Sequence, residues 1–226
     1  MLEVVPAVLP KTFAELEEKL EFLKGVATSV QIDITDGKFA GIASWPLGKP
    51  DENFEAIVRE ERGMPFWEDF EFEFDLMIKD PFSFIPDLIT AGATKIILHA
   101  ASIDLDSDQL LLDQLRTEGI VQVGIAFEND AEEELIREFL PYADFVQCMG
   151  IAKIGYQGQS FDPRVIDQIK WIHNELPTMP IAVDGGMNLD TAALVADAGA
   201  TKIVVGSYLL QSQNPLESVR EMQNLI

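Results

Sequence analysis

Three aspartates, Asp33, Asp75 and Asp184, stand at or near the ends of short apolar segments of the sequence. A buried carboxylate is costly unless it is paired, hydrogen-bonded or bound to a metal. Any one of them could simply cap a strand end, but three in equivalent positions favour a shared site. Two carboxylates on opposite sides of a substrate can exchange a proton at a carbon centre, because one removes it and the other returns one from the far side. We therefore predict two-base proton exchange by Asp33 and Asp184.

Glycines gather in three later segments of the chain, and these suggest a phosphate site. The segments are Gly155-Tyr156-Gln157-Gly158-Gln159, Gly185-Gly186 and Gly206-Ser207. Backbone N–H groups in such loops and at helix N-termini bind phosphate in many α/β barrels. Glycine also serves ordinary tight turns, so no single segment is decisive. Three in succession favour a phosphate site.

The elements that position these residues alternate between strand and helix along the whole chain. Runs rich in Val, Ile and Phe, most of them apolar on both faces, predict parallel strands at 2–9, 29–36, 70–78, 94–100, 121–127, 144–152, 180–184 and 201–206. Helical spacing predicts helices at 12–23, 54–62, 82–91, 107–116, 131–140, 163–175, 189–198 and 215–225.

Eight such units in 226 residues predict one (β/α)8 TIM barrel domain over residues 1–226. The predicted strands that carry Asp33 and Asp184 are the second and the seventh, which lie far apart in a ring of eight. We therefore expect the two carboxylates to face each other across the mouth of the barrel.

The charge of the chain argues against two classes of partner. With 39 acidic and 16 basic residues the net charge is −23, which disfavours nucleic acid and anionic membranes. No signal peptide or membrane-spanning segment is evident, and the lone Cys148 leaves no intrachain disulfide. We expect a cytoplasmic homo-oligomer that binds neither nucleic acid nor membranes.

Longer phrases connect the sequence to a known family. They are Val5-Pro6-Ala7-Val8-Leu9, Asp33-Ile34-Thr35-Asp36-Gly37-Lys38-Phe39, Asp75-Leu76-Met77-Ile78, Gly155-Tyr156-Gln157-Gly158-Gln159-Ser160-Phe161 and Val183-Asp184-Gly185-Gly186-Met187-Asn188. Through all eight units the chain resembles the ribulose-phosphate 3-epimerases. The resemblance implies a ribulose-phosphate-binding barrel that interconverts D-ribulose 5-phosphate and D-xylulose 5-phosphate through an enediolate. It implies Asp33 and Asp184 as the acid/base pair. We expect Gly155, Gly158, Gly185, Gly186, Gly206 and Ser207 to bind the phosphate, and Lys153 to bind the substrate with them.

The family binds a divalent metal with two His and two Asp, and this sequence departs from that pattern. Gln31 and Asp75 occupy the positions of the two His. An all-oxygen set of Gln31, Asp33, Asp75 and Asp184 would suit Mg²⁺, Mn²⁺ or Ca²⁺ better than Zn²⁺. Alternatively, Lys153 supplies the positive charge in place of the metal. A third interpretation is another sugar-phosphate reaction, such as an aldolase or decarboxylase, or phospho-ligand binding without turnover.

Two further features stay open. His99 ends the fourth predicted strand and could either face the site or lie satisfied in the barrel wall. The long connection 44–64 could cover the mouth, form an oligomer surface or be an ordinary loop.

Overall fold

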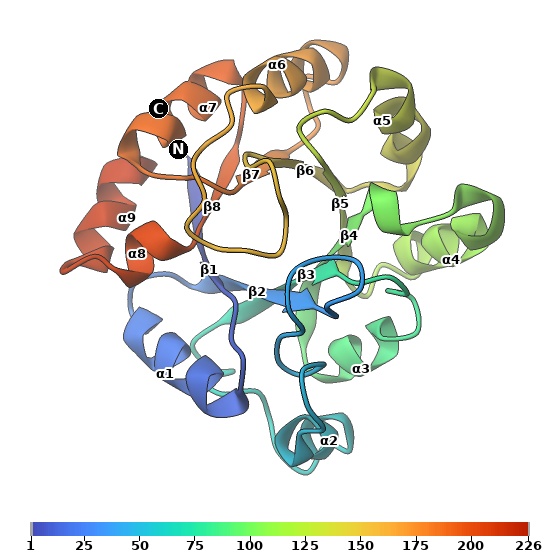
Figure 1. Ribbon diagram of the computed structural model, residues 1–226, viewed down its shortest axis with the longest axis vertical. Coiled ribbons are helices and arrows are strands. Elements are labelled where there is room, and N and C mark those ends of the chain that lie inside the picture. The colour runs from blue at the N-terminus through green and yellow to red at the C-terminus, as the bar shows by residue number, and fades with distance from the viewer. Residues whose placement is uncertain (1, 226) are drawn as a thin grey trace.

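The computed structural model describes residues 2–225 of the chain. Eight parallel strands close a barrel in chain order, and helices surround it (Figure 1). The strands are β1 (Glu3–Val8), β2 (Ser29–Thr35), β3 (Glu71–Met77), β4 (Ala93–His99), β5 (Gln122–Phe127), β6 (Phe145–Met149), β7 (Ile181–Asp184) and β8 (Lys202–Val205). The predicted (β/α)8 barrel is thereby confirmed.

The helices follow the strands along the chain. They are α1 (Phe13–Leu23), α2 (Glu52–Val58), α3 (Ile85–Thr90), α4 (Leu105–Glu118), α5 (Glu133–Phe139), α6 (Val165–Glu175), α7 (Leu189–Ala198), α8 (Ser207–Leu210) and α9 (Pro215–Gln223), with 3₁₀ turns η1 (Ala100–Ser102) and η2 (Leu140–Tyr142). Within residues 2–225 no helix combines the length and the apolar character needed to cross a membrane.

Local sequence explains where several elements begin and end. The side chain of Thr12 accepts a hydrogen bond from the backbone N–H of Glu15 and caps α1. Asp51 caps α2 in the same way, so that this helix begins two residues before the predicted start at 54 and ends earlier, at Val58. Strand β6 was predicted to reach residue 152 but ends at Met149, because the chain turns into a loop at Gly150. The short α8 was not predicted.

The core has two parts, separated by the wall of the barrel. Outward-facing strand residues such as Ile32, Phe74 and Ile125 are fully buried against the helices. A smaller apolar cluster of inward-facing and mouth residues contains Ile97, Ala126, Phe145, Met149, Ile151 and Ala182. Apolar side chains therefore cover the outer face of the sheet all around the barrel.

The inward face is more polar than the sequence suggested. Gln31, Glu73, Asp75, Gln147 and Lys202 are all buried, so the prediction that most strands are apolar on both faces is wrong for their inner face. Such side chains can be buried here because they pair with one another across the closed barrel. Glu73 on β3, for example, contacts Lys202 on β8.

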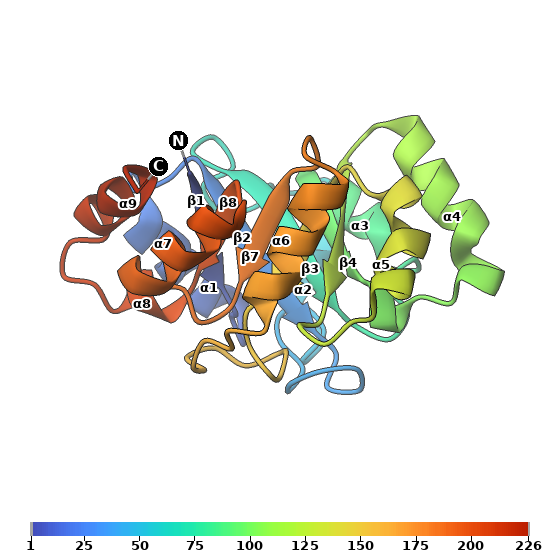
Figure 2. The same cartoon turned by 90° about the horizontal axis from the view of Figure 1, so that it is seen from above.

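Two long connections project from the same end of the barrel, where the strands end (Figure 2). They follow β2 and β6, and they meet backbone to backbone at Gly41 and Gly155. A Cβ atom on Gly41 would lie 2.5 Å from the carbonyl oxygen of Gly155. Both residues also have positive φ values, of 64° and 81°, which favour glycine. Close contact between the two loops therefore depends on glycine at both positions.

The connection after β2 also includes part of the segment 44–64. Its Trp45 is 2 % exposed and packs against Phe13 and Phe54, with ring centroids 5.8 and 5.5 Å away. The beginning of this segment is therefore anchored in the layer between the barrel and α1 and α2.

Candidate active site

A cavity of about 290 Å³ opens at the end of the barrel from which the two loops project. Asp33 and Asp184 both line it. So do six further residues that the sequence predicted to bind phosphate: Gly155, Gly158, Gly185, Gly186, Gly206 and Ser207. The structure thus brings the proposed acid/base pair and the glycine loops to one cavity.

Lys153 is placed elsewhere. Its side chain is exposed, and Nζ lies 4.7 Å from the centre of the Tyr156 ring in the same loop. Among the described residues, Lys153 is not part of the cavity lining, whereas its neighbours Ile151, Gly155 and Tyr156 are. This position does not favour the interpretation in which Lys153 stabilises charge on a reacting substrate.

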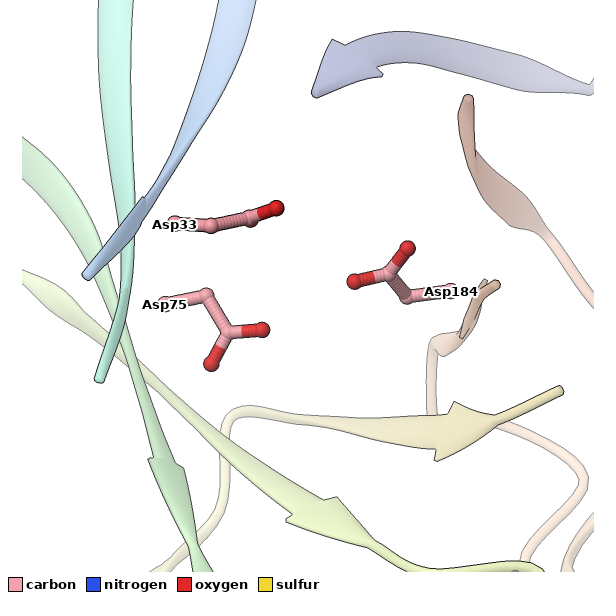
Figure 3. Close-up of side chains that lie close together, drawn as sticks. All are labelled: Asp33, Asp75 and Asp184. Atoms are coloured by element: carbon pink, nitrogen blue, oxygen red, sulfur yellow. The ribbon is translucent and has the colours of Figure 1, made fainter. Parts of the chain in front are cut away.

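Three carboxylates converge at the floor of the cavity. Asp33 and Asp75 are register partners on β2 and β3, and Asp184 comes from β7 on the opposite side of the barrel. One oxygen of each lies within 4.8 Å of the others. Figure 3 shows Asp33 and Asp75 pointing from one wall toward Asp184 on the other.

Gln31 connects the two carboxylates of the predicted acid/base pair. Its Nε2 donates to Oδ1 of Asp33 at 3.0 Å and to Oδ2 of Asp184 at 3.1 Å. Gln31 and Asp33 share the inner face of β2 because they are two residues apart in a strand. The Oε1 atom of Gln31 is buried and has no hydrogen-bond partner within the described chain.

Asp75 has two partners of its own, one for each oxygen. Nε2 of His99, at the end of β4, lies 2.9 Å from Oδ1, and Nε2 of Gln147 on β6 donates to Oδ2 at 3.1 Å. His99 therefore faces the site, which the sequence left open. Gln147 was missed, although its position two residues before the cavity-lining Met149 places both side chains on the same face of β6.

Burial and mutual repulsion change the acidity of this group. Burial raises the pKa of Asp33 well above its usual value, and the charges of Asp184 and Asp75 raise it further. Burial, followed by the charge of Asp75, raises the pKa of Asp184 to about 7. A carboxyl group with such a pKa can hold or release a proton near neutral pH, as a general acid or base must.

The same residues fit a divalent cation. Asp33, Asp75 and Asp184 supply three clustered carboxylates, and Gln31 adds a buried amide oxygen that has no partner among residues 2–225. This all-oxygen donor set matches the preference of hard cations such as Mg²⁺ and Mn²⁺. A bound cation would also offset the repulsion between the buried carboxylates.

The glycine-lined side of the cavity offers backbone N–H groups. Gly206 is the N-cap residue of α8 and has no side chain to cover the start of that helix. The Nε2 atom of Gln157 donates to the carbonyl oxygen of Ala7 at 3.3 Å and would lie 3.0 Å from a Cβ atom on Gly206. Gln157 therefore ties the loop after β6 to the end of β1, beside this part of the cavity.

Comparison with known proteins agrees with this geometry. The sequence profile of the ribulose-phosphate 3 epimerase family matches residues 3–210. The ribulose-phosphate 3-epimerase of Schizosaccharomyces pombe is 27% identical over 99% of this chain and 93% of its own length. The enzyme of the same name from Chlamydia pneumoniae is 34% identical over 82% of this chain and 77% of its own.

Solved structures with lower identity share the fold. The 3-hexulose-6-phosphate synthase from Salmonella typhimurium superposes with a TM-score of 0.69 at 18% identity, covering 99% of this chain and 98% of its own. KGPDC from Streptococcus mutans gives a TM-score of 0.69 at 10% identity, covering 100% of this chain and 97% of its own. Both likenesses concern the barrel fold alone.

Proposed function

Because the chain belongs to the ribulose-phosphate 3-epimerase family, we propose that it interconverts D-ribulose 5-phosphate and D-xylulose 5-phosphate. The observation that carries the proposal is the pair of cavity-lining carboxylates, Asp33 and Asp184, on opposite sides of the barrel. They lie beside glycine loops suited to a phosphate group. A cytoplasmic homo-oligomer that acts on a phosphorylated sugar, without nucleic acid or membrane partners, is the setting we propose.

The reaction needs one base and one acid on opposite faces of the same carbon. One aspartate, ionised, takes the proton from the carbon next to the ketone, and the electron pair moves to the carbonyl oxygen to give an enediolate. The other aspartate, protonated, then delivers a proton to the opposite face of that carbon. Exchange of the two roles between Asp33 and Asp184 gives the reverse reaction.

The surroundings of the pair support this division of roles. In the metal-free site the pKa of Asp33 is raised and that of Asp184 rises to about 7, which favours a state with one carboxyl protonated and the other ionised. Gln31 donates to both carboxylates and holds them in place on either side of the cavity floor. The reacting groups are therefore positioned before the substrate arrives.

A divalent cation, Mg²⁺ or Mn²⁺, is part of this proposal. Asp33, Asp75 and Asp184 would bind it, and Gln31 would join them with its amide turned so that Oε1 faces the carboxylates in place of Nε2. When bound, the cation supplies positive charge that stabilises the negative charge developing on the substrate oxygens.

Incubation with D-ribulose 5-phosphate in deuterated water tests the proposal, with proton NMR as the readout. We expect deuterium at carbon 3 together with the appearance of xylulose 5-phosphate. Asp33→Asn and Asp184→Asn should each lower the rate ~10²–10⁴-fold, the usual contribution of a general acid or base. Asp197→Asn, at an exposed position of α7, serves as the control and should keep the wild-type rate.

The same experiment separates the rival functions. An aldolase or decarboxylase would consume a sugar phosphate without exchange at carbon 3, and a binding protein would give no turnover. A loss of less than roughly tenfold in either Asp→Asn variant would refute its role as acid or base.

A further inference from the structure

Asp75 differs from the other two aspartates in its relation to the cavity. It is 0 % exposed, and within the described residues it is absent from the cavity lining that includes Asp33 and Asp184. One of its oxygens nevertheless lies within 4.8 Å of theirs. Asp75 thus lies beside the pair and close to both carboxylates, but outside the lining of the cavity.

Two buried side chains control the orientation of Asp75. His99 and Gln147 are 1 % and 0 % exposed, and they contact Oδ1 and Oδ2 respectively. Because the contacts come from β4 and β6 and engage different oxygens, they oppose rotation of the carboxylate. The ring of His99 is itself held edge-on against Phe39, with the ring centroids 5.8 Å apart.

Two buried amide oxygens beside this group have no hydrogen-bond partner within the described residues. Gln31 and Gln147 each direct Nε2 to the aspartates, and the Oε1 atom of each is buried without a partner in the part of the chain that the structure describes. A buried acceptor normally has a partner. Lys202, the buried lysine whose charge reaches Asp184, is already engaged by Glu73. A cation with its bound water would provide partners for these oxygens.

We propose that Gln147 and His99 are positioning residues that fix Asp75 as the third carboxylate ligand of a divalent cation held with Asp33 and Asp184. The proposal deepens the proposed function, since it concerns the cation of the same site. Ligating carboxylates are themselves commonly hydrogen-bonded, and loss of such partners typically lowers metal affinity ~10–100-fold.

The test is calorimetric titration of the metal-stripped protein with Mn²⁺ at neutral pH. Gln147→Met and His99→Leu remove the donors to Asp75 with little change in side-chain bulk. We expect each to raise the Mn²⁺ dissociation constant ~10–100-fold. His99→Gln restores an N–H donor at this position and should recover much of the affinity, which a purely space-filling role would not require.

Gln168→Leu is the matched control. Gln168 on α6 is also buried, donates to the carbonyl oxygen of Glu128 at 2.8 Å and has an unpartnered Oε1 among residues 2–225, but it lies outside the barrel interior. The same change of an amide to an apolar group should leave Mn²⁺ affinity at the wild-type value. Thermal unfolding of each metal-free variant shows whether it is folded.

If Gln147→Met does not fold, the Mn²⁺ dissociation constants of His99→Leu and His99→Gln test the proposal. Equal, wild-type affinities in these two variants would then overturn it. Wild-type affinity in both Gln147→Met and His99→Leu overturns the proposal, and so does a wild-type protein that binds no Mn²⁺. The epimerase proposal has its own readout, exchange at carbon 3 by the wild-type protein without metal removal, which does not depend on the Mn²⁺ affinities of these variants. The two failures are therefore distinguishable.

Discussion

Replacement of Asp184 by Asn should stabilise the metal-free protein at neutral pH even though it removes a proposed catalytic group. The ionised carboxylate is costly in this buried position next to Asp75, which is why its pKa rises to about 7. Asparagine has nearly the same shape, carries no charge and still offers an oxygen to Nε2 of Gln31, which donates to Oδ2 of Asp184. The substitution removes the electrostatic cost and keeps the hydrogen bond.

The size of the stabilisation expected for Asp184→Asn follows from the difference between the pKa of Asp184 in the folded state and in the unfolded state. The value rises from 3.8 to about 7, a difference of about three units, and each unit corresponds to about 1.36 kcal/mol. The upper limit is therefore about 4 kcal/mol, and partial exposure of Asp184 at the cavity reduces our expectation to about 2 kcal/mol.

The direction in which stability changes with pH depends on whether the folded or the unfolded state binds more protons. Between about pH 4 and about pH 7 the unfolded state has lost the proton of this residue and the folded state retains it. The stability of the wild-type protein thus falls as the pH rises through this window. The Asn variant has no such proton, so its advantage over wild type should grow from near zero at about pH 4 to about 2 kcal/mol at about pH 8.

Urea unfolding at a series of pH values, followed by circular dichroism with a chelator present, measures this difference. Asp197→Asn, at an exposed position of the same βα unit, is the control for an Asp-to-Asn change away from the site. A difference between Asp184→Asn and wild type that does not change with pH would refute the reasoning. So would a variant that is less stable than wild type at about pH 8.

Three more predictions test other parts of the structure. Glu73→Gln leaves Lys202 without its buried anion and should lower the free energy of unfolding by about 3–5 kcal/mol in urea titrations. Glu61→Gln on the surface should leave that free energy nearly unchanged, and a small loss for Glu73→Gln would contradict the pairing. Gln157→Glu puts a negative charge beside the glycine loops and should raise KM for ribulose 5-phosphate about tenfold with little change in kcat, and an unchanged KM would place the phosphate elsewhere. Cys148 is fully buried, and burial raises the pKa of its thiol to about 12, so it should react with Ellman's reagent in urea but not in the native protein.

Local sequence predicted most of the architecture. The strands lie within one or two residues of the apolar runs at nearly every end, because burial of the outer face against helices requires such runs. Asp33, Asp75 and Asp184 could be predicted to converge because the ends of parallel strands in a closed barrel meet at one face. The exception is β6, where an apolar stretch continues into a loop whose Ile151 packs at the barrel mouth.

The contacts across the barrel could not be predicted in the same way. Gln147 reaches Asp75 over 72 positions of sequence, and Lys202 reaches Glu73 over 129. Strand alternation gives the face on which each side chain lies, but closure of the barrel decides which of them meet. For Lys153 the prediction from sequence placed the side chain too close to the site. The residue follows β6 directly, but the conformation of its loop brings Nζ over the ring of Tyr156.

The ion pairs inside the other end of the barrel also bear on the acidity of the site. Lys202 and Lys95 lie with Glu73 toward the beginnings of their strands, and the charge of Lys202 lowers the pKa of Asp184. Positive charge at one end of the barrel interior therefore favours ionised carboxylates at the other. Residues that never contact the substrate can in this way shift the pH range in which one aspartate is an acid and the other a base.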